Sequence, residues 1–155
     1  KYILVYYILD PIFSDNFVKS LAKKFNLDVI FYNAFNLRKI NKGYRNYNSI
    51  GPVQFLNLLN NAELVVTTSF HGLAMSLIFN KPFYFETNPK YDTMNSRVRT
   101  LIDELNIGDR QIKNSNSEDE QYDDIDWDKI NKNIEKYKES SIQIIKDDLG
   151  LNYDN

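Results

Sequence analysis

The amino-acid sequence predicts an α/β fold with a mostly parallel sheet and flanking helices. Short apolar runs rich in Val, Ile and aromatic residues alternate along the chain with amphipathic stretches of helical period. Such runs suit strands that are buried on both faces, as the strands of parallel sheets are. The chain has 155 residues, of which 43% are hydrophobic, enough for a domain with its own core. We therefore expect residues 1–155 to form a single α/β domain with a long C-terminal helix.

The first part of the chain predicts a strand–helix–strand unit. Residues 3–9 are almost continuously apolar or aromatic, and Asp10-Pro11 ends this run. A helix follows over residues 15–25, for which Ser14 is a suitable cap. Residues 27–32 then form a second apolar run. In a parallel sheet such a unit crosses over with a right-handed connection.

Residues 33–50 are polar and irregular, and four of them are basic: Arg38, Lys39, Lys42 and Arg45. Long loops of this kind over a sheet edge are often functional, so a solvated loop and a ligand contact are both open interpretations. A helix is expected over residues 52–61, with Pro52 in its first turn. Its apolar residues expected to face inward are Val53, Leu56 and Leu59, with Phe55 as a further candidate.

The next stretch predicts a strand, a tight turn, a helix and another strand. Leu64-Val65-Val66 is a short buried run, and Thr67-Thr68-Ser69 supplies hydroxyl groups that cap helices. The helix ends at Asn80-Lys81-Pro82, and residues 82–86 form the next strand. The apolar residues on one face of this helix are Phe70, Leu73, Ala74, Leu77 and Ile78.

The last part of the chain predicts two loops and two helices. Residues 87–95 form a loop, and residues 96–105 form a helix that Gly108 ends. Residues 113–124 are polar and acidic and predict a mobile surface loop. A long helix begins after a cap near Asp126, and it must bury its apolar stripe on this domain or on another part of the protein. The stripe consists of Trp127, Ile130, Ile134, Tyr137, Ser141 and Ile144.

The expected strand order, numbered along the chain, is second, first, third, fourth, so the connections reverse direction between the first and third strands. Ligands of α/β sheets bind outside the carboxyl ends of the strands at such a point. Asp10-Pro11 and residues 67–71 would lie there. His71, the only histidine, is at the start of a helix, whose N–H groups and dipole favour anions. The sequence therefore predicts an anion site with His71 at the mouth of a crevice.

Composition excludes several other classes of function. A net charge of −2 gives no reason to expect nucleic acid or an anionic membrane as a partner. The chain has no cysteine, which excludes disulfides and thiolate metal sites and fits a cytoplasmic protein. No apolar run approaches the length of a membrane span, and nothing in the sequence requires a metal or another cofactor. Lys1 opens directly onto a core strand, so we expect a piece from the second half of a longer protein.

Residues 61–72 (NAELVVTTSFHG) followed by Lys81-Pro82-Phe83 resemble the carboxyl-terminal half of polysaccharide pyruvyl transferases. The surrounding segments YILVYYILD, GPVQFL and SRVRTLIDELN agree, so the resemblance covers most of the chain. It implies a Rossmann-like domain similar to the C-terminal domain of the two-domain GT-B glycosyltransferases. The missing N-terminal domain would then be a partner of this one, and the isolated chain would be inactive.

The resemblance also implies a reaction. Members of the family transfer a pyruvyl group from phosphoenolpyruvate to a sugar of a cell-surface or exopolysaccharide, forming a pyruvate ketal. Phosphoenolpyruvate is then the donor substrate, no cofactor is needed, and the second partner is a saccharide acceptor. A cytoplasmic enzyme would lie at the inner face of the membrane where that acceptor is lipid-linked.

Five residues are candidates for this chemistry. Histidine can give or take a proton near neutrality, so His71 is the expected catalytic residue, as general acid/base or as phosphate ligand. Ser69 either caps the helix or contacts an anion, and Gly72 allows close approach of a ligand or close helix–strand packing. Lys90 and Arg97 would clamp phosphate or carboxylate, although Arg97 could equally be part of a solvated helix face.

The sequence is also compatible with two other functions. A nucleotide-sugar glycosyltransferase of the GT-B type could hold a diphosphate at the same helix, and Glu86 would then bind ribose hydroxyl groups. The chain could also be a non-catalytic α/β interaction module, because the sequence offers no obvious second catalytic group near His71.

Overall fold

The computed structural model describes residues 1–32, 44–48, 50–116, 121–122 and 124–151. In this part of the chain five strands form one parallel sheet in the order β3-β2-β1-β4-β5. The strands are β1 (Tyr2–Tyr6), β2 (Asp28–Tyr32), β3 (Arg45–Tyr47), β4 (Leu64–Thr67) and β5 (Phe83–Phe85). The α/β class is confirmed, and so is the expected order of the four strands that the sequence predicts.

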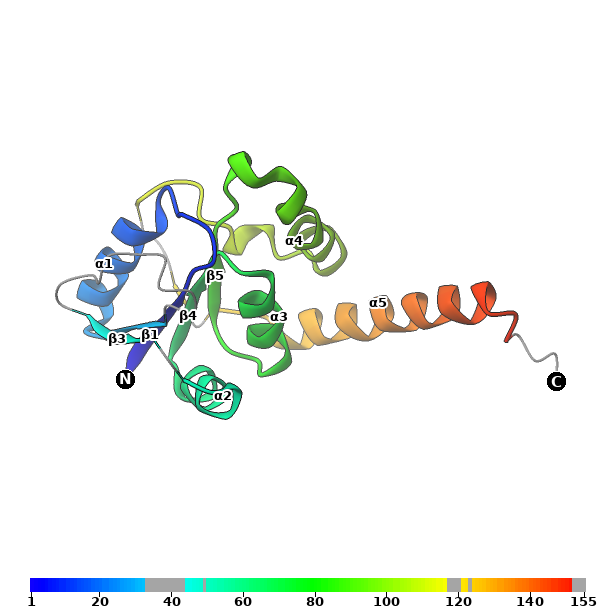
Figure 1. Ribbon diagram of the computed structural model, residues 1–155, viewed down its shortest axis with the longest axis horizontal. Helices are drawn as coiled ribbons and strands as arrows, with labels where there is room; N and C mark the ends of the chain where they lie inside the picture. The colour runs from blue at the N-terminus through cyan, green and yellow to red at the C-terminus, as the bar shows by residue number, and fades with distance from the viewer. Residues whose placement is uncertain (33–43, 49, 117–120, 123, 152–155) are drawn as a thin grey trace.

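Helices cover both faces of the sheet (Figure 1). They are α1 (Ser14–Phe25), α2 (Pro52–Asn61), α3 (Phe70–Ile78), α4 (Asp92–Leu105) and α5 (Trp127–Asp148), with the 3-10 helices η1 (Pro89–Tyr91) and η2 (Gly108–Arg110). Side chains of α1 pack with one face of the strands, and side chains of α2, α3, α4 and the start of α5 pack with the other. The result is a three-layer α/β/α arrangement.

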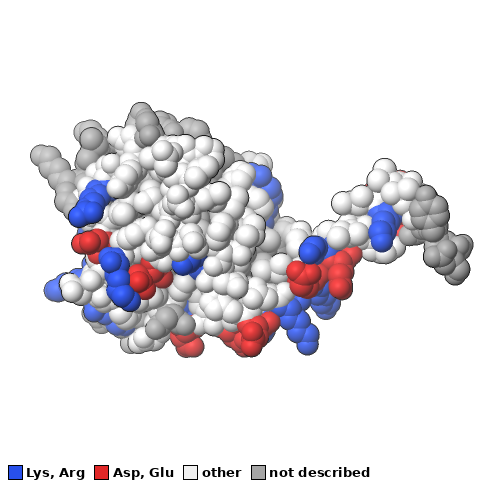
Figure 2. Space-filling model, turned by 90° about the horizontal axis from the view of Figure 1, so that it is seen from below, with Lys and Arg blue, Asp and Glu red and all other residues white. Residues whose placement is uncertain are grey.

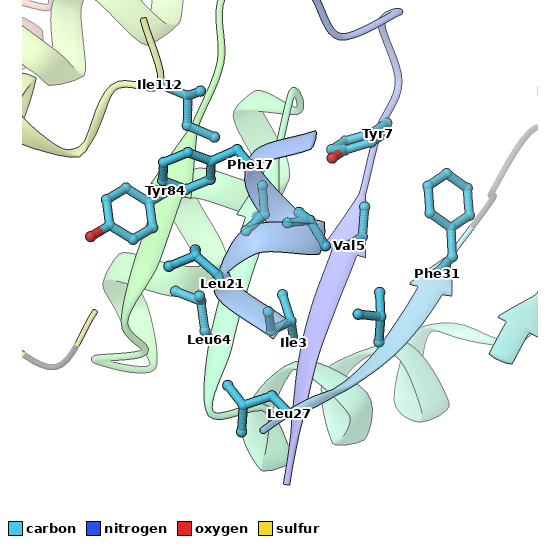
Figure 3. Packing of buried hydrophobic residues seen from close by; sticks show 13 residues of the cluster. Ile3, Val5, Tyr7, Phe17, Leu21, Leu27, Phe31, Leu64, Tyr84 and Ile112 are labelled. Carbon is cyan, nitrogen blue, oxygen red and sulfur yellow. The ribbon is translucent and has the colours of Figure 1, made fainter. Parts of the chain in front are cut away.

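The two hydrophobic clusters follow the alternation of side chains along β1. Ile3 and Val5 belong to the cluster that includes α1, whereas Leu4 belongs to the cluster on the opposite face. Figure 3 shows Phe17 and Leu21 of α1 among the strand residues of the first cluster. Because β1 is buried on both faces, its run of apolar residues is continuous, as the parallel sheet requires.

β1 is shorter than predicted, and α1 begins differently. The N–H groups of Ile8 and Leu9 donate to the Thr68 hydroxyl oxygen at 3.1 Å instead of continuing the sheet, so the strand ends at Tyr6. The expected capping role of Ser14 is wrong. α1 starts at Ser14 itself, and the Ser14 hydroxyl donates to the carboxylate of Glu86.

The predicted loop over residues 33–50 contains the edge strand β3. It pairs with β2, and Arg45 of β3 lies opposite Ile30 of β2. Polar residues dominate this short strand, so it lacks the apolar pattern that marks the others. Residues 33–43 and 49, including Arg38, Lys39 and Lys42, lie outside the described residues, as do 117–120 and 123 of the acidic loop.

Two apolar residues do not face the core as predicted. The side chain of Val53 is 72% exposed and that of Ile78 is 70% exposed. At 100° per residue, Val53 is far around α2 from buried Leu59, and Ile78 is far around α3 from buried Leu73. Helix α4 also begins at Asp92, four residues before the predicted start.

α5 contacts the domain only through its first half. Ile130 is buried, and Ile134 and Tyr137 pack partly against the cluster that includes α4. Further along, Ile144 is 59% exposed, and Figure 1 shows this part of α5 running away from the rest of the fold. The expected stripe is therefore buried on this domain over only part of its length. No helix among the described residues combines the length and the apolar character that crossing a membrane requires.

Candidate functional site

Three neighbouring strands, β1, β4 and β5, end at the same level of the sheet. Tyr6 of β1 pairs in register with Thr67 of β4, and Thr67 pairs with Phe85 of β5. After β1 the chain builds β2 and β3 on one side, and then returns to add β4 and β5 on the other. The boundary between β1 and β4 is thus the switch point that the sequence predicts, and the turn containing His71 follows β4 directly.

Hydrogen bonds tie the loops at this edge together. The Thr67 hydroxyl donates to the carbonyl of Tyr6 at 2.6 Å, and the Thr68 hydroxyl donates to the carbonyl of Leu9 at 3.0 Å. The Asn88 amide, from the loop after β5, donates to the carbonyl of Asp10 at 2.9 Å. The loops that follow β1, β4 and β5 therefore form one connected surface, as a preorganised site needs.

Ser69 is the N-cap of α3. Its hydroxyl oxygen accepts a hydrogen bond from the Gly72 N–H at 3.4 Å, and its own N–H donates to the Thr67 hydroxyl at 2.9 Å. The Ser69 residue is only 1% exposed. These contacts match the capping interpretation of Ser69.

Gly72 lies in close contact with two strands. A Cβ atom there would be 2.3 Å from the Thr67 hydroxyl oxygen and 3.0 Å from a ring carbon of Tyr6. No side chain fits without displacing α3, β1 or β4. The close helix–strand packing proposed for Gly72 is therefore present.

His71 is exposed in the first turn of α3, and the neighbouring Phe70 ring contacts both His71 and a cation. The ring centroids of His71 and Phe70 are 5.7 Å apart at 78°. The guanidinium carbon of Arg97, from α4, lies 4.8 Å from the centroid of the same Phe70 ring. The fold thus brings Arg97 to the turn that carries His71, although 26 positions separate them in the sequence.

Lys90 occupies a different position. Its ammonium nitrogen is 5.7 Å from the ring centroid of Tyr91, the next residue in η1. The side chain is exposed, and none of its described contacts joins it to α3. Lys90 is therefore beyond the carboxyl end of β5, in the loop that also holds Asn88, but it is not part of the cluster of His71, Phe70 and Arg97.

Glu86 has a role that the sequence did not suggest. Glu86 is only 3% exposed. Its carboxylate accepts hydrogen bonds from the N–H groups of Ile12, Phe13 and Ser14 at 2.5 to 3.2 Å. The Ser14 hydroxyl also donates to it. The carboxylate thus occupies the positive end of α1, and it is not available for the ribose hydroxyl groups of a nucleotide sugar. A carboxylate directly after a buried strand, as in FYFE, is the sequence signal for such a partner.

An aromatic cluster lies beside the start of α3. The ring centroids of Tyr6, Tyr32 and Phe55 are 5.0 to 5.3 Å apart. Burial raises the pKa of the Tyr6 hydroxyl, and the adjacent Ser69 side chain lowers it by less. The Tyr6 hydroxyl is therefore uncharged at neutral pH. Sequence reasoning missed this cluster because its three residues come from β1, β2 and α2.

No three His, Asp or Glu side chains gather into a potential metal site within the described ranges. The candidate site is thus built from one imidazole, one guanidinium group, a helix N-terminus and aromatic rings. Such a combination suits an anionic ligand that also carries an apolar or planar part.

Comparison with known proteins identifies a family for this chain. The family described as polysaccharide pyruvyl transferase matches residues 3–89, which is more than half of the 155-residue chain. The matched range contains β1 to β5, the capped start of α3 and His71. No curated protein matches the chain. On the strength of the family match, the chain belongs to the polysaccharide pyruvyl transferase family.

Proposed function

We propose that the protein transfers a pyruvyl group from phosphoenolpyruvate to a saccharide and forms a pyruvate ketal, with His71 at the reacting centre. One observation carries the proposal: the exposed imidazole of His71 lies at the N-terminus of α3, at the switch point of the sheet, and Arg97 contacts the adjacent Phe70 ring. Phosphoenolpyruvate carries a phosphate and a carboxylate, and both groups need positive partners.

The reaction balances without an oxidant or a second donor. A proton adds to the methylene carbon of phosphoenolpyruvate, and the adjacent carbon becomes oxocarbenium-like. One hydroxyl oxygen of the sugar bonds to that carbon and loses its proton. The bond from that carbon to the phosphate oxygen then breaks, and a second hydroxyl of the same sugar takes its place. One of the two hydroxyl protons balances the proton added to carbon, and the other leaves with inorganic phosphate.

The described groups divide this work between them. His71 is the general acid/base that gives the proton to the methylene carbon, or it binds the phosphate group. Arg97 and Lys90 supply positive charge for the carboxylate and the phosphate, and the first turn of α3 adds oriented N–H donors. Ser69 and Gly72 hold that turn in place through the cap and the close packing described above.

The proposal is tested by the full-length protein with phosphoenolpyruvate and a neutral oligosaccharide. We expect acceptor-dependent release of inorganic phosphate and a new methyl signal of the ketal in the proton NMR spectrum. Thermal shift provides the comparison of donors, because a ligand that binds the folded state raises its melting temperature. Stabilisation by nucleotide sugars but not by phosphoenolpyruvate would refute the choice of donor, and release of phosphate without a modified sugar would refute the transfer.

A further inference from the structure

A hollow lies beside α2, toward the β3 edge of the sheet. Its volume is about 380 Å³, within the range of roughly 300–1,000 Å³ that is typical of small-molecule sites. The side chains that define it come from Tyr2, Tyr47, Gln54, Asn57, Leu58 and Asn61. We call it the α2 groove. His71, Arg97 and Lys90 do not line it.

Among the residues that the structure describes, the lining of the α2 groove carries no charged side chain. Helix α2 itself contains no Lys, Arg, Asp or Glu. Figure 2 views the molecule from the side on which α2 lies in Figure 1, and a broad area of that face is free of charged residues. A phosphate or carboxylate would therefore meet no cation among the described lining residues, so neutral ligands suit this lining better than anions.

Three amide side chains project from one face of α2 into this groove. Gln54, Asn57 and Asn61 are three and four positions apart, the spacing that places residues on the same side of a helix. The Gln54 side-chain oxygen accepts from the Gly51 N–H at 2.6 Å, and the Asn61 amide donates to the Asn57 carbonyl at 2.8 Å. The Asn57 side-chain amide has no hydrogen-bond partner among the residues that the structure describes. It can therefore offer a ligand both a donor and an acceptor.

Two tyrosine rings, together with Ile50 and Leu58, form the rest of the wall. The Tyr2 hydroxyl donates to the carbonyl of Leu58 at 2.6 Å, which fixes that ring against α2. Tyr47, on the edge strand β3, is 37% exposed. Aromatic faces and neutral amides together suit a ligand with C–H faces and many hydroxyl groups. A purely apolar ligand would remove water from the amides without replacing their hydrogen bonds.

We propose that the α2 groove binds an uncharged saccharide through the Asn57 amide and the Tyr47 ring. This ligand chemistry is distinct from that of the anion site around His71. Saccharide binding to this groove does not rest on the proposed function.

Binding is measured by calorimetry on the full-length protein with a short neutral gluco- or galacto-oligosaccharide and without phosphoenolpyruvate. Asn57→Ala and Tyr47→Ala each remove one ligand contact, and we expect each to weaken binding by about tenfold. Asn60→Ala is the matched control, because Asn60 is an exposed amide on the same helix that does not line the groove. It should bind like the unchanged protein, and Tyr47→Phe, which keeps the ring, should retain most of the affinity.

Equal affinity in Asn57→Ala, Tyr47→Ala and Asn60→Ala would overturn the inference, and so would the absence of binding by the unchanged protein. Thermal melting of each variant shows that it is folded. The inference and the proposed function fail separately. If the oligosaccharide binds through Asn57 and Tyr47 but phosphoenolpyruvate is not a donor, the groove stands and the proposed function falls.

Discussion

The carboxylate of Glu86, directly after β5, accepts a hydrogen bond at 2.8 Å from the N–H of Ser14, the first residue of α1. Two further N–H groups from the preceding loop point at the same carboxylate. The fold thus uses one of its own side chains as the anion at the start of α1. The start of α3 has no such internal carboxylate among its described contacts, and its exposed residue is His71.

Replacing Glu86 with Gln should lower the free energy of unfolding by about 2–4 kcal/mol. The glutamine amide keeps the size of the side chain but carries no charge. Its NH₂ group would also face the backbone N–H groups that donate to the carboxylate, and two donors cannot form a hydrogen bond. The measurement is urea denaturation at neutral pH. Glu104→Gln is the control, since Glu104 is exposed on α4, and a comparable loss of stability in both variants would contradict the role of Glu86.

Gly72→Ala should destabilise the protein by about 1–3 kcal/mol through overpacking. The new Cβ would come within 2.3 Å of the Thr67 hydroxyl oxygen. Gly108→Ala is a matched control, because a Cβ at Gly108 meets only Ile102, at an ordinary 3.5 Å. Denaturation curves of the two variants compare them directly, and equal stability would show that the α3 turn is not held by close packing.

Tyr6→Phe should reduce the loss of stability in alkali. Burial raises the folded-state pKa of Tyr6 above its ordinary value of 10.0, so the folded state holds this proton more tightly than the unfolded state. The resulting stabilisation is fully present below pH 10.0 and is lost as the pH rises through the folded-state pKa. Urea denaturation between pH 8 and about pH 11 measures the slope. A slope unchanged by the substitution would argue against burial of this hydroxyl.

Arg97→Ala should raise the KM for phosphoenolpyruvate by about tenfold or more, because a charged hydrogen bond to the donor is lost. Arg99 is exposed on the same helix, two positions further along. Arg99→Ala should leave the KM almost unchanged. If the two variants have the same KM, Arg97 belongs to the solvated helix face that the sequence also allowed.

The sequence predicted the layers and the strand order because both depend on strong local patterns. The apolar run Leu64-Val65-Val66 indicates a buried strand. The hydroxyl residues and the amphipathic stretch that follow it indicate a capped helix. The same periodicity overestimated burial at Val53 and Ile78, since an apolar residue in a helix need not face the core. β3 was missed because its three residues, Arg45 to Tyr47, pair at an edge without an apolar run.

The site was predictable only where its groups are close in the sequence. Ser69, His71 and Gly72 follow one strand, so their placement at its carboxyl end was evident. The stacking of Arg97 on Phe70 and the partner of Glu86 depend on tertiary contacts, over 27 and 72 positions in the sequence. The spacing of residue types along the sequence does not predict which distant side chains will contact each other. The α2 groove likewise requires β1, β3 and α2 to be placed together.

The most direct test of the central claim is the rate of pyruvyl transfer by full-length His71→Ala. His71 is exposed, so its loss should leave the melting temperature almost unchanged, and any effect on the rate reports chemistry or donor binding. We predict a loss of transfer of about 100-fold or more, the scale of a missing general acid or anion ligand. Transfer at the rate of the unchanged protein would contradict the account.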